Sequence, residues 1–394
     1  MDTLLRRYPQ AGGAQELLSF SPRPFSAASV VATSQGKVFV KRHARAVRDR
    51  EGLLEEHRLI AHLAAAMEDK ATARVAGGES DSAQYGLAQP VLSDIDGETA
   101  IPLGDWTYEV HPVAQGVDVY EQAISWTPFL SPKHARAAGR ALAQLHQAVQ
   151  SYRAPARKMQ QLVSSFTIFA GHQATLHEGH SKADDDPYEA MEAYLEQRPL
   201  LRKYAEERNW RGSFHALLVP FHRQLEPWLT YLEPIWTHND FHASNLIWSE
   251  DGVDAKVCGI IDFGLADRTN AVHDLATAIE RNIIEWLRMV EPGAAMLHLD
   301  HLDALLAGYE ELSPLSYEET RALAAMLPLV HCEFALSETD YFLSVLLSRE
   351  KAYLAYEGYF LAHAEWFRGA EGRRLLEHLE RWAEDRPRVR GGQR

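Results

Sequence analysis

The chain has 394 residues, of which 46% are hydrophobic, and its formal net charge at pH 7 is -15. That length and apolar content can bury a large core and suit two lobes better than one. The acidic balance argues against nucleic acid as a partner, because a phosphate backbone requires a basic face.

Cysteine usage and hydropathy indicate the compartment. The two cysteines, Cys258 and Cys332, are too few for a disulfide framework, so a reducing cytoplasm is expected. Residues 1–15 lack the apolar segment of a signal peptide, and no apolar run is long enough to span a membrane. We therefore expect a soluble cytoplasmic protein without a membrane partner. The composition leaves the oligomeric state open.

The first part of the chain has the patterns of a small sheet followed by a helix. Residues 1–24 are predicted to be a helical or irregular lead-in. Alternating apolar residues predict strands at 29–33 and 37–41, separated by a turn at 34–36. Apolar residues at helical spacing then predict an amphipathic helix over 51–66.

The middle of the chain changes from strands to helices. Residues 67–90 are rich in Gly, Ser and Asp and are predicted to be a loop. Further strands are expected near 90–92 and at 106–110, with a turn between them. From Pro132 onward the chain is mainly helical, and its first helix is expected over 134–149.

A possible metal site in the helical part deserves little weight. His177 and His180 lie close to an acidic run at 184–186. Their spacing has no accompanying ligand pattern, and a run of like charges is usually a solvated loop. We therefore predict a surface loop there.

The most informative stretch is 236–267. It places His238, Asp240 and Asn245 in an H-N-D-F-x-x-x-N arrangement, followed by Asp262 in I-I-D-F-G. In a kinase, the first Asp accepts the proton of the substrate hydroxyl, and the Asn and the second Asp hold magnesium. Each motif alone would be weak evidence. Together, in this order, they indicate phosphoryl transfer, with Asp240 and His238 in the catalytic motif.

A predicted hairpin brings the two metal ligands together. Residues 246–248 and 257–261 are apolar and flank a turn at 249–252. Asn245 precedes the first strand and Asp262 ends the second, so their side chains should lie side by side. Oxygen ligands of this kind suit Mg²⁺. The alternative is an ordinary hairpin whose polar ends are caps.

These motifs resemble those of the aminoglycoside phosphotransferase and choline kinase-like family, the small-molecule branch of the protein-kinase-like fold. Phe241-His242 after the catalytic Asp is similar to this branch, whereas Asn239 stands where the branch usually has Gly. The resemblance implies an α+β, bilobal protein-kinase-like fold. We expect a nucleotide-binding lobe with an antiparallel sheet at 1–114 and a mainly helical lobe at 115–394.

The resemblance also implies how the first lobe binds ATP. Lys41 in V-F-V-K resembles the lysine that binds the α- and β-phosphates; the alternative is a solvated lysine on an edge strand. A glutamate of the following helix should pair with it. Glu56 fits this role best and Glu55 is the fallback. The residues from Phe25 to Ser29 stand where kinases usually have a glycine-rich loop.

Two further assignments follow from the resemblance. The run at 111–116 is similar to the interlobe hinge, where the carbonyl of Pro112 and the N–H of Ala114 would bind adenine. Proline suits the first position because only its carbonyl is needed. Asp274, in D-L-A at the start of a predicted helix, would brace the catalytic loop without reacting.

The expected function is ATP- and Mg²⁺-dependent phosphorylation of a hydroxyl group on a small molecule. A protein serine/threonine kinase of the same branch and a catalytically silent binding module remain as alternatives. The acceptor is expected to be neutral or cationic, because the net charge of -15 and the acidic run at 184–186 should attract cations.

Overall fold

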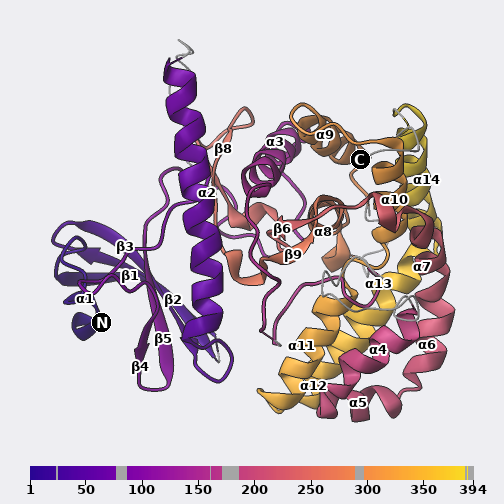
Figure 1. Ribbon diagram of the computed structural model, residues 1–394, viewed down its shortest axis with the longest axis horizontal. Helices are drawn as coiled ribbons and strands as arrows, with labels where there is room; N and C mark the ends of the chain where they lie inside the picture. The colour runs from indigo at the N-terminus through magenta and orange to yellow at the C-terminus, as the bar shows by residue number, and fades with distance from the viewer. Residues whose placement is uncertain are drawn as a thin grey trace.

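The computed structural model has two lobes, an antiparallel sheet with one long helix and a larger helical part, which confirms the predicted α+β kinase-like fold (Figure 1). The structure describes residues 1–23, 25–76, 87–159, 161–170, 186–288, 297–386 and 388.

The N-terminal lobe is built on a five-stranded antiparallel sheet in the order β1-β2-β3-β5-β4. Its strands are β1 (Ala14–Arg23), β2 (Ser26–Thr33), β3 (Gly36–Ala44), β4 (Ile101–Leu103) and β5 (Trp106–Pro112). Val38 and Val40 of β3 face a small apolar core beneath the short helix α1 (Asp2–Leu5). Because strand side chains alternate, Lys41 faces the other side, where it stands opposite Glu109 of β5.

Two predictions for this lobe are wrong in detail. The helical or irregular lead-in expected at 1–24 contains the helix α1 but also the strand β1. Leu17 and Phe20 of β1 are exposed, so burial left no clear alternating pattern, and it is backbone pairing with β2 that forms the strand. The expected strand at 90–92 is absent. In this segment, the N–H of Leu92 donates a hydrogen bond to the carbonyl of Val110 in β5.

The helix after β3 is longer than its apolar pattern indicated. Helix α2 spans Arg50–Ala76, so it continues into the segment predicted to be a loop. Helix-favouring Ala, Glu and Lys residues at 65–72 explain the extension, since helix propensity does not require an apolar face. The rest of the predicted loop, up to residue 86, lies outside the described residues.

Two short antiparallel pairs carry the central motifs. Strand β7 (Leu246–Trp248) pairs with β8 (Val257–Ile260), which confirms the predicted hairpin. Strand β6 (Pro234–Thr237) pairs with β9 (Asp267–Asn270), and their register sets Thr237 opposite Asp267. The two pairs therefore place the segment after Thr237 beside the segment before Asp267.

The helical lobe has one large apolar core. Within this lobe, α3 (Pro132–Val149) packs along α9 (Leu299–Glu310), and α8 (Ala271–Asn282) packs against β6 and β9 (Figure 1). The predicted helix at 134–149 is thus confirmed. The remaining helices are α4 (Pro187–Glu196), α5 (Pro199–Glu206), α6 (Trp210–Leu217), α7 (Val219–Leu225), α10 (Tyr317–Met326), α11 (Cys332–Ser344), α12 (Arg349–Tyr353), α13 (Ala362–Phe367) and α14 (Ala370–Glu384), with a π-helical stretch at Leu354–Leu361.

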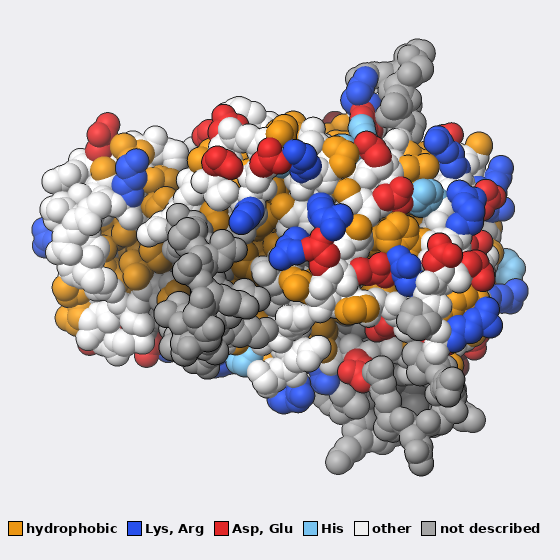
Figure 2. Space-filling view, turned by 90° about the horizontal axis from the view of Figure 1, so that it is seen from above, with side chains coloured by type: hydrophobic (Ala, Val, Ile, Leu, Met, Phe, Trp, Pro, Cys, Tyr) orange, Lys and Arg blue, Asp and Glu red, His pale blue; other side chains and the backbone are white. Residues whose placement is uncertain are grey.

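Acidic and basic side chains are interspersed over the helical lobe on the face shown in Figure 2. Among the described residues, no helix is both long and apolar enough to span a membrane.

Helices α3 and α9 approach closely because each has a glycine at the contact. A methyl group added at Gly139 would lie 2.0 Å from the carbonyl oxygen of Leu305, and one at Gly308 would lie 2.0 Å from that of Arg136. These are backbone atoms, so neither contact can relax by a side-chain rotation. The axis-to-axis spacing at the centre of the lobe therefore depends on both glycines.

We predict that Gly139→Ala lowers the free energy of unfolding by about 1–3 kcal/mol or more, the usual cost of overpacking. The matched control is Gly358→Ala, also in a helical segment but with no atom within 4 Å of the added methyl group. The control should be neutral, or stabilising by up to about 1 kcal/mol. Urea denaturation compares the two, and equal stabilities would contradict the close-packing argument.

Candidate active site

The catalytic loop, residues 238–245, is held from below by Asp274 in the first turn of α8. Its carboxylate accepts the backbone N–H groups of His238 and Asn239, each at 2.8 Å. His146 of α3 lies 3.0 Å from the same carboxylate. Burial works to raise the pKa of Asp274, but these partners outweigh it and lower the pKa. The predicted bracing role of Asp274 is confirmed.

Asn239 occupies a position that glycine would favour. Its φ is 59°, in the left-handed region, where Asn is better tolerated than most residues. Its side-chain oxygen accepts from Thr237 Oγ1 at 2.8 Å and Thr269 Oγ1 at 3.1 Å, and its amide donates to the Leu265 carbonyl at 3.3 Å. Asn239 in place of Gly thus keeps the left-handed turn. Its side chain also links β6, β9 and the segment before β9 by hydrogen bonds.

Asp240, the predicted base, follows this turn. One carboxylate oxygen lies 3.5 Å from Arg281 Nη2, and the other lies 3.6 Å from His242 Nε2 and 3.5 Å from Asn245 Nδ2. Burial works to raise the pKa of Asp240, but His242 and then Arg281 lower it below the ordinary value. The carboxylate is therefore held ionised, as a proton acceptor must be.

His238 is completely buried beneath the loop. Its Nε2 lies 3.0 Å from the carbonyl oxygen of Ile261, and its Nδ1 accepts the N–H of Asp240 at 3.3 Å. These contacts tie the catalytic loop to the segment before Asp262. The geometry gives His238 a positioning role: it holds the backbone of Asp240, the predicted base.

The predicted metal ligands come together at the end of the β7–β8 hairpin. The Asn245 amide nitrogen donates to the Asp240 carbonyl at 3.0 Å, so this bond does not use the side-chain oxygen of Asn245. The N–H of Ile261 bonds to the Asn245 carbonyl at 3.0 Å, so Asp262 follows directly. Asp262 has a φ of 57° and a half-exposed carboxylate. An amide oxygen and a carboxylate are donors that fit Mg²⁺.

Lys41 and Glu56 do not form the predicted ion pair. The ammonium of Lys41 donates to Asp262 Oδ1 at 2.8 Å, whereas the buried Glu56 accepts from Arg48 at 3.0 Å. Arg48 lies just before α2 and reaches Glu56 directly, so it satisfies the carboxylate. The fallback Glu55 lies 3.9 Å from Arg157.

The Lys41–Asp262 pair shifts both pKa values. The ammonium of Lys41 lowers the pKa of Asp262 far below its ordinary value. Burial works to lower the pKa of Lys41, but Asp262 and Glu109 raise it overall. Both groups therefore stay charged, which a phosphate-binding cation and a metal-binding carboxylate require.

Sequence reasoning missed two arginines that hold the segment after Asp262. Arg48 donates to the Gly264 carbonyl at 2.8 Å, and Arg157 donates to the same carbonyl at 2.9 Å and to Gly52 of α2 at 2.9 Å. Burial lowers the pKa of Arg157, and Glu56 partly offsets this. No local motif marks either residue, because each acts on a segment more than a hundred residues away.

The predicted hinge leads from β5 to the hairpin. Pro112 ends β5, and Val117 forms a two-way backbone pair with Trp248 of β7 at 2.7 and 2.9 Å. A side chain at Gly116, whose φ is 125°, would lie 2.5 Å from the Trp248 carbonyl. Pro112 and Ala114 therefore lie between the sheet and the metal-ligand hairpin, and adenine binding there stays a prediction.

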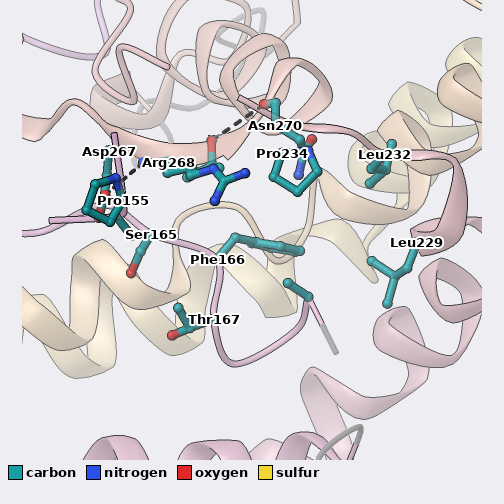
Figure 3. A pocket seen from close by; sticks show the side chains of 13 residues that line it. Pro155, Ser165, Phe166, Thr167, Leu229, Leu232, Pro234, Asp267, Arg268 and Asn270 are labelled. Atoms are coloured by element: carbon teal, nitrogen blue, oxygen red, sulfur yellow. Dashed lines mark hydrogen bonds between the residues drawn. The ribbon is translucent and has the colours of Figure 1, made fainter. Parts of the chain in front are cut away.

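A separate cavity of about 130 Å³ lies behind β9. Arg268 extends into it above Phe166, with Thr167 and Asn270 on its walls (Figure 3). Asp267 lies at its edge and accepts the N–H groups of Arg157 and Arg268 at 2.8 and 2.7 Å. None of the residues predicted for catalysis, nucleotide binding or the metal lines this cavity within the described part of the chain.

The histidines considered for a metal site, His177 and His180, lie outside the described residues, as do Asp184 and Asp185. Asp186, the last of the acidic run, caps α4 by accepting the N–H of Tyr188 at 2.9 Å.

Comparisons with known proteins give the family and the fold of the chain. The model of the phosphotransferase enzyme family (APH) matches residues 25–315. No curated protein matches the chain. Among solved structures, an aminoglycoside phosphotransferase from Alicyclobacillus acidocaldarius is 16% identical, with a TM-score of 0.52 over 96% of this chain and 95% of that one. This likeness supports the fold.

Two further solved structures have lower TM-scores. A spectinomycin phosphotransferase in complex with ADP and spectinomycin is 12% identical, with a TM-score of 0.47 over 92% of this chain and 96% of that one. An aminoglycoside phosphotransferase with ADP and hygromycin B is 14% identical, with a TM-score of 0.46 over 93% and 98%.

We predict that Asp262→Ala and Lys41→Ala each weaken Mg·ATP binding by about 10–100-fold, the value of a charge-assisted contact. Isothermal titration calorimetry measures this without turnover. Lys133→Ala is the control, because Lys133 pairs with Asp254 at the surface at 2.6 Å and should leave binding unchanged. If both site variants bind like the parent, the nucleotide binds elsewhere.

Proposed function

Because the chain belongs to the phosphotransferase enzyme family, we propose that it transfers the γ-phosphoryl group of ATP to a hydroxyl group of a small molecule. The observation that carries this proposal is the convergence of Lys41, Asp240, Asn245 and Asp262. Lys41 of β3 contacts Asp262, which follows β8, and Asn245 contacts Asp240 in the catalytic loop; these are the residue types that phosphoryl transfer requires.

Each residue has a role in the proposed reaction. Asp240 accepts the proton of the acceptor hydroxyl as its oxygen attacks phosphorus, and Lys41 binds the phosphates. Asn245 and Asp262 would hold Mg²⁺, which neutralises charge on the phosphates when bound. His238 and Asp274 keep the loop in position through the contacts described above.

The two lobes also contact each other through an aromatic pair. Phe25, in the turn between β1 and β2, packs edge-on against Tyr341 of α11, with ring centroids 6.4 Å apart. This turn stands where kinases have a loop over the phosphates. Its contact with α11 would help to hold that turn against the helical lobe.

The surroundings of Asp240 support a cationic or neutral acceptor. Glu338 of α11 lies near Arg281 and Tyr359, and burial raises its pKa, with Arg281 partly offsetting this. Among the described residues, none makes a hydrogen bond to the Glu338 carboxylate. The Glu338 carboxylate would give an amine-bearing alcohol an anionic partner.

We predict that Asp240→Asn lowers kcat by about 10²–10⁴-fold, the contribution of general-base catalysis, while the affinity for Mg·ATP stays near that of the parent. Phosphate incorporation into a library of hydroxylated metabolites, with protein acceptors included, identifies the acceptor and measures this loss. Near-normal phosphorylation by the variant would show that Asp240 is not the base.

A further prediction concerns acceptor charge. Glu338→Gln should raise KM for an amine-bearing acceptor by about tenfold, the value of one charge-assisted contact, and leave KM for a matched neutral acceptor unchanged. Initial rates with both acceptors, at low and high salt, make the comparison. A carboxylate acceptor preferred by the parent enzyme, with no dependence on salt, would refute the proposed acceptor class.

A further inference from the structure

We propose that Arg281 is a positioning residue for the catalytic carboxylate of Asp240. This inference rests on the proposed function, since it assigns a second group to the same proton-accepting site. Arg281 lies in the last turn of α8, and its Nη2 is 3.5 Å from Asp240 Oδ1. The Arg281 side chain is only 4% exposed, so its charge acts from a dehydrated position.

The guanidinium is fixed by its own surroundings. Its Nε lies 3.4 Å from Glu280 Oε2, and its planar group lies 4.5 Å from the ring centroid of Trp126 and 5.2 Å from that of Phe334. A rigid guanidinium is less strongly hydrated than an ammonium and stacks on aromatic faces. The arginine therefore presents its Nη2 to Asp240 in one orientation.

Glu280 is held in turn by residues from other segments. Its Oε1 accepts from Trp126 Nε1 at 3.2 Å and lies 3.1 Å from His363 Nδ1. Trp126 has a φ of 73°, which is uncommon for a bulky residue. Strained backbone of this kind persists where the surrounding structure over-determines it, and it often lies at functional sites. Here it sets the indole both over Arg281 and against Glu280.

The contacts leave Asp240 oriented but available. Arg281 faces Oδ1, while His242 and Asn245 face Oδ2. Each of these distances is 3.5 Å or more, longer than a strong hydrogen bond to a carboxylate. Donors therefore surround the Asp240 carboxylate without making short hydrogen bonds to it. Its oxygens remain able to accept a strong hydrogen bond from the substrate hydroxyl.

Stability alone does not explain the buried set of Asp240, Arg281 and Glu280. Taking charges out of water is costly, and well-packed apolar residues of similar volume are often as stable or more stable. A chain that needed only packing at position 281 could place Met or Leu among Trp126 and Phe334. The presence of a cation at position 281 is explained if it orients the carboxylate of Asp240.

The test is a double-mutant cycle between Arg281→Met and Asp240→Asn, read as kcat for phosphoryl transfer. If no metabolite acceptor has been identified, water is the acceptor and Mg·ATP hydrolysis is the readout. Arg281→Met in the parent background should lower kcat by about 100-fold, the effect of a small misplacement of a catalytic group. The same change in the Asp240→Asn background should alter kcat by no more than about twofold, because the group it positions is already gone.

Two measurements separate positioning from structural damage. The Kd for Mg·ATP and the Tm of Arg281→Met should stay close to the parent values, and Arg281→Lys should recover part of the lost kcat. If Arg281→Met does not fold, Arg281→Lys and Glu280→Gln replace it in the cycle.

The outcomes are distinguishable. An equal loss of kcat in both backgrounds, within about twofold, would show that Arg281 acts independently of Asp240 and would overturn the inference. An undiminished kcat for Arg281→Met would also overturn it. If Asp240→Asn itself keeps parental kcat, the proposed function fails first, and the inference about Arg281 fails with it.

Discussion

The Asp274 carboxylate is the contact on which the geometry of the site depends. It is completely buried, and it receives two backbone N–H groups of the catalytic loop together with a histidine of α3. A buried charge of this kind is tolerable only when it is fully hydrogen-bonded. The loop, α8 and α3 must therefore keep one relative position. The closeness of α3 to α9, set by Gly139 and Gly308, extends the same constraint across the helical lobe.

Two residues with left-handed backbones turn the chain at the site. Asn239 precedes the predicted base, and Asp262 is a predicted metal ligand. Such conformations cost about 1–2 kcal/mol in non-glycine residues, so neighbouring contacts must hold them. Thr237 and Thr269 hold Asn239 from the β6–β9 pair. Around Asp262, the ion pair with Lys41 and the two arginine contacts to Gly264 supply the restraint.

Sequence could predict the parts of the site that are local along the chain. The β7–β8 hairpin follows from local patterns, and the bracing role of Asp274 follows from the family resemblance of a D-L-A motif within about forty residues of Asp240. Arg157 and Arg281 could not be predicted, because their roles depend on which segments the tertiary fold brings together. The strand β1 was missed for a related reason: Leu17 and Phe20 are exposed, so pairing with β2 defines it and burial does not.

Charge compensation links the two halves of the proposed reaction centre. Asp262 has Lys41 as its cation and Asp240 has Arg281, and each pair helps to keep its carboxylate ionised. The two cations differ in the way that their tasks require. Lys41 is on a flexible stem and can move from the carboxylate to a phosphate when nucleotide enters. Arg281 is clamped by Glu280 and stacked on aromatic rings, so it can keep Asp240 fixed while the acceptor changes.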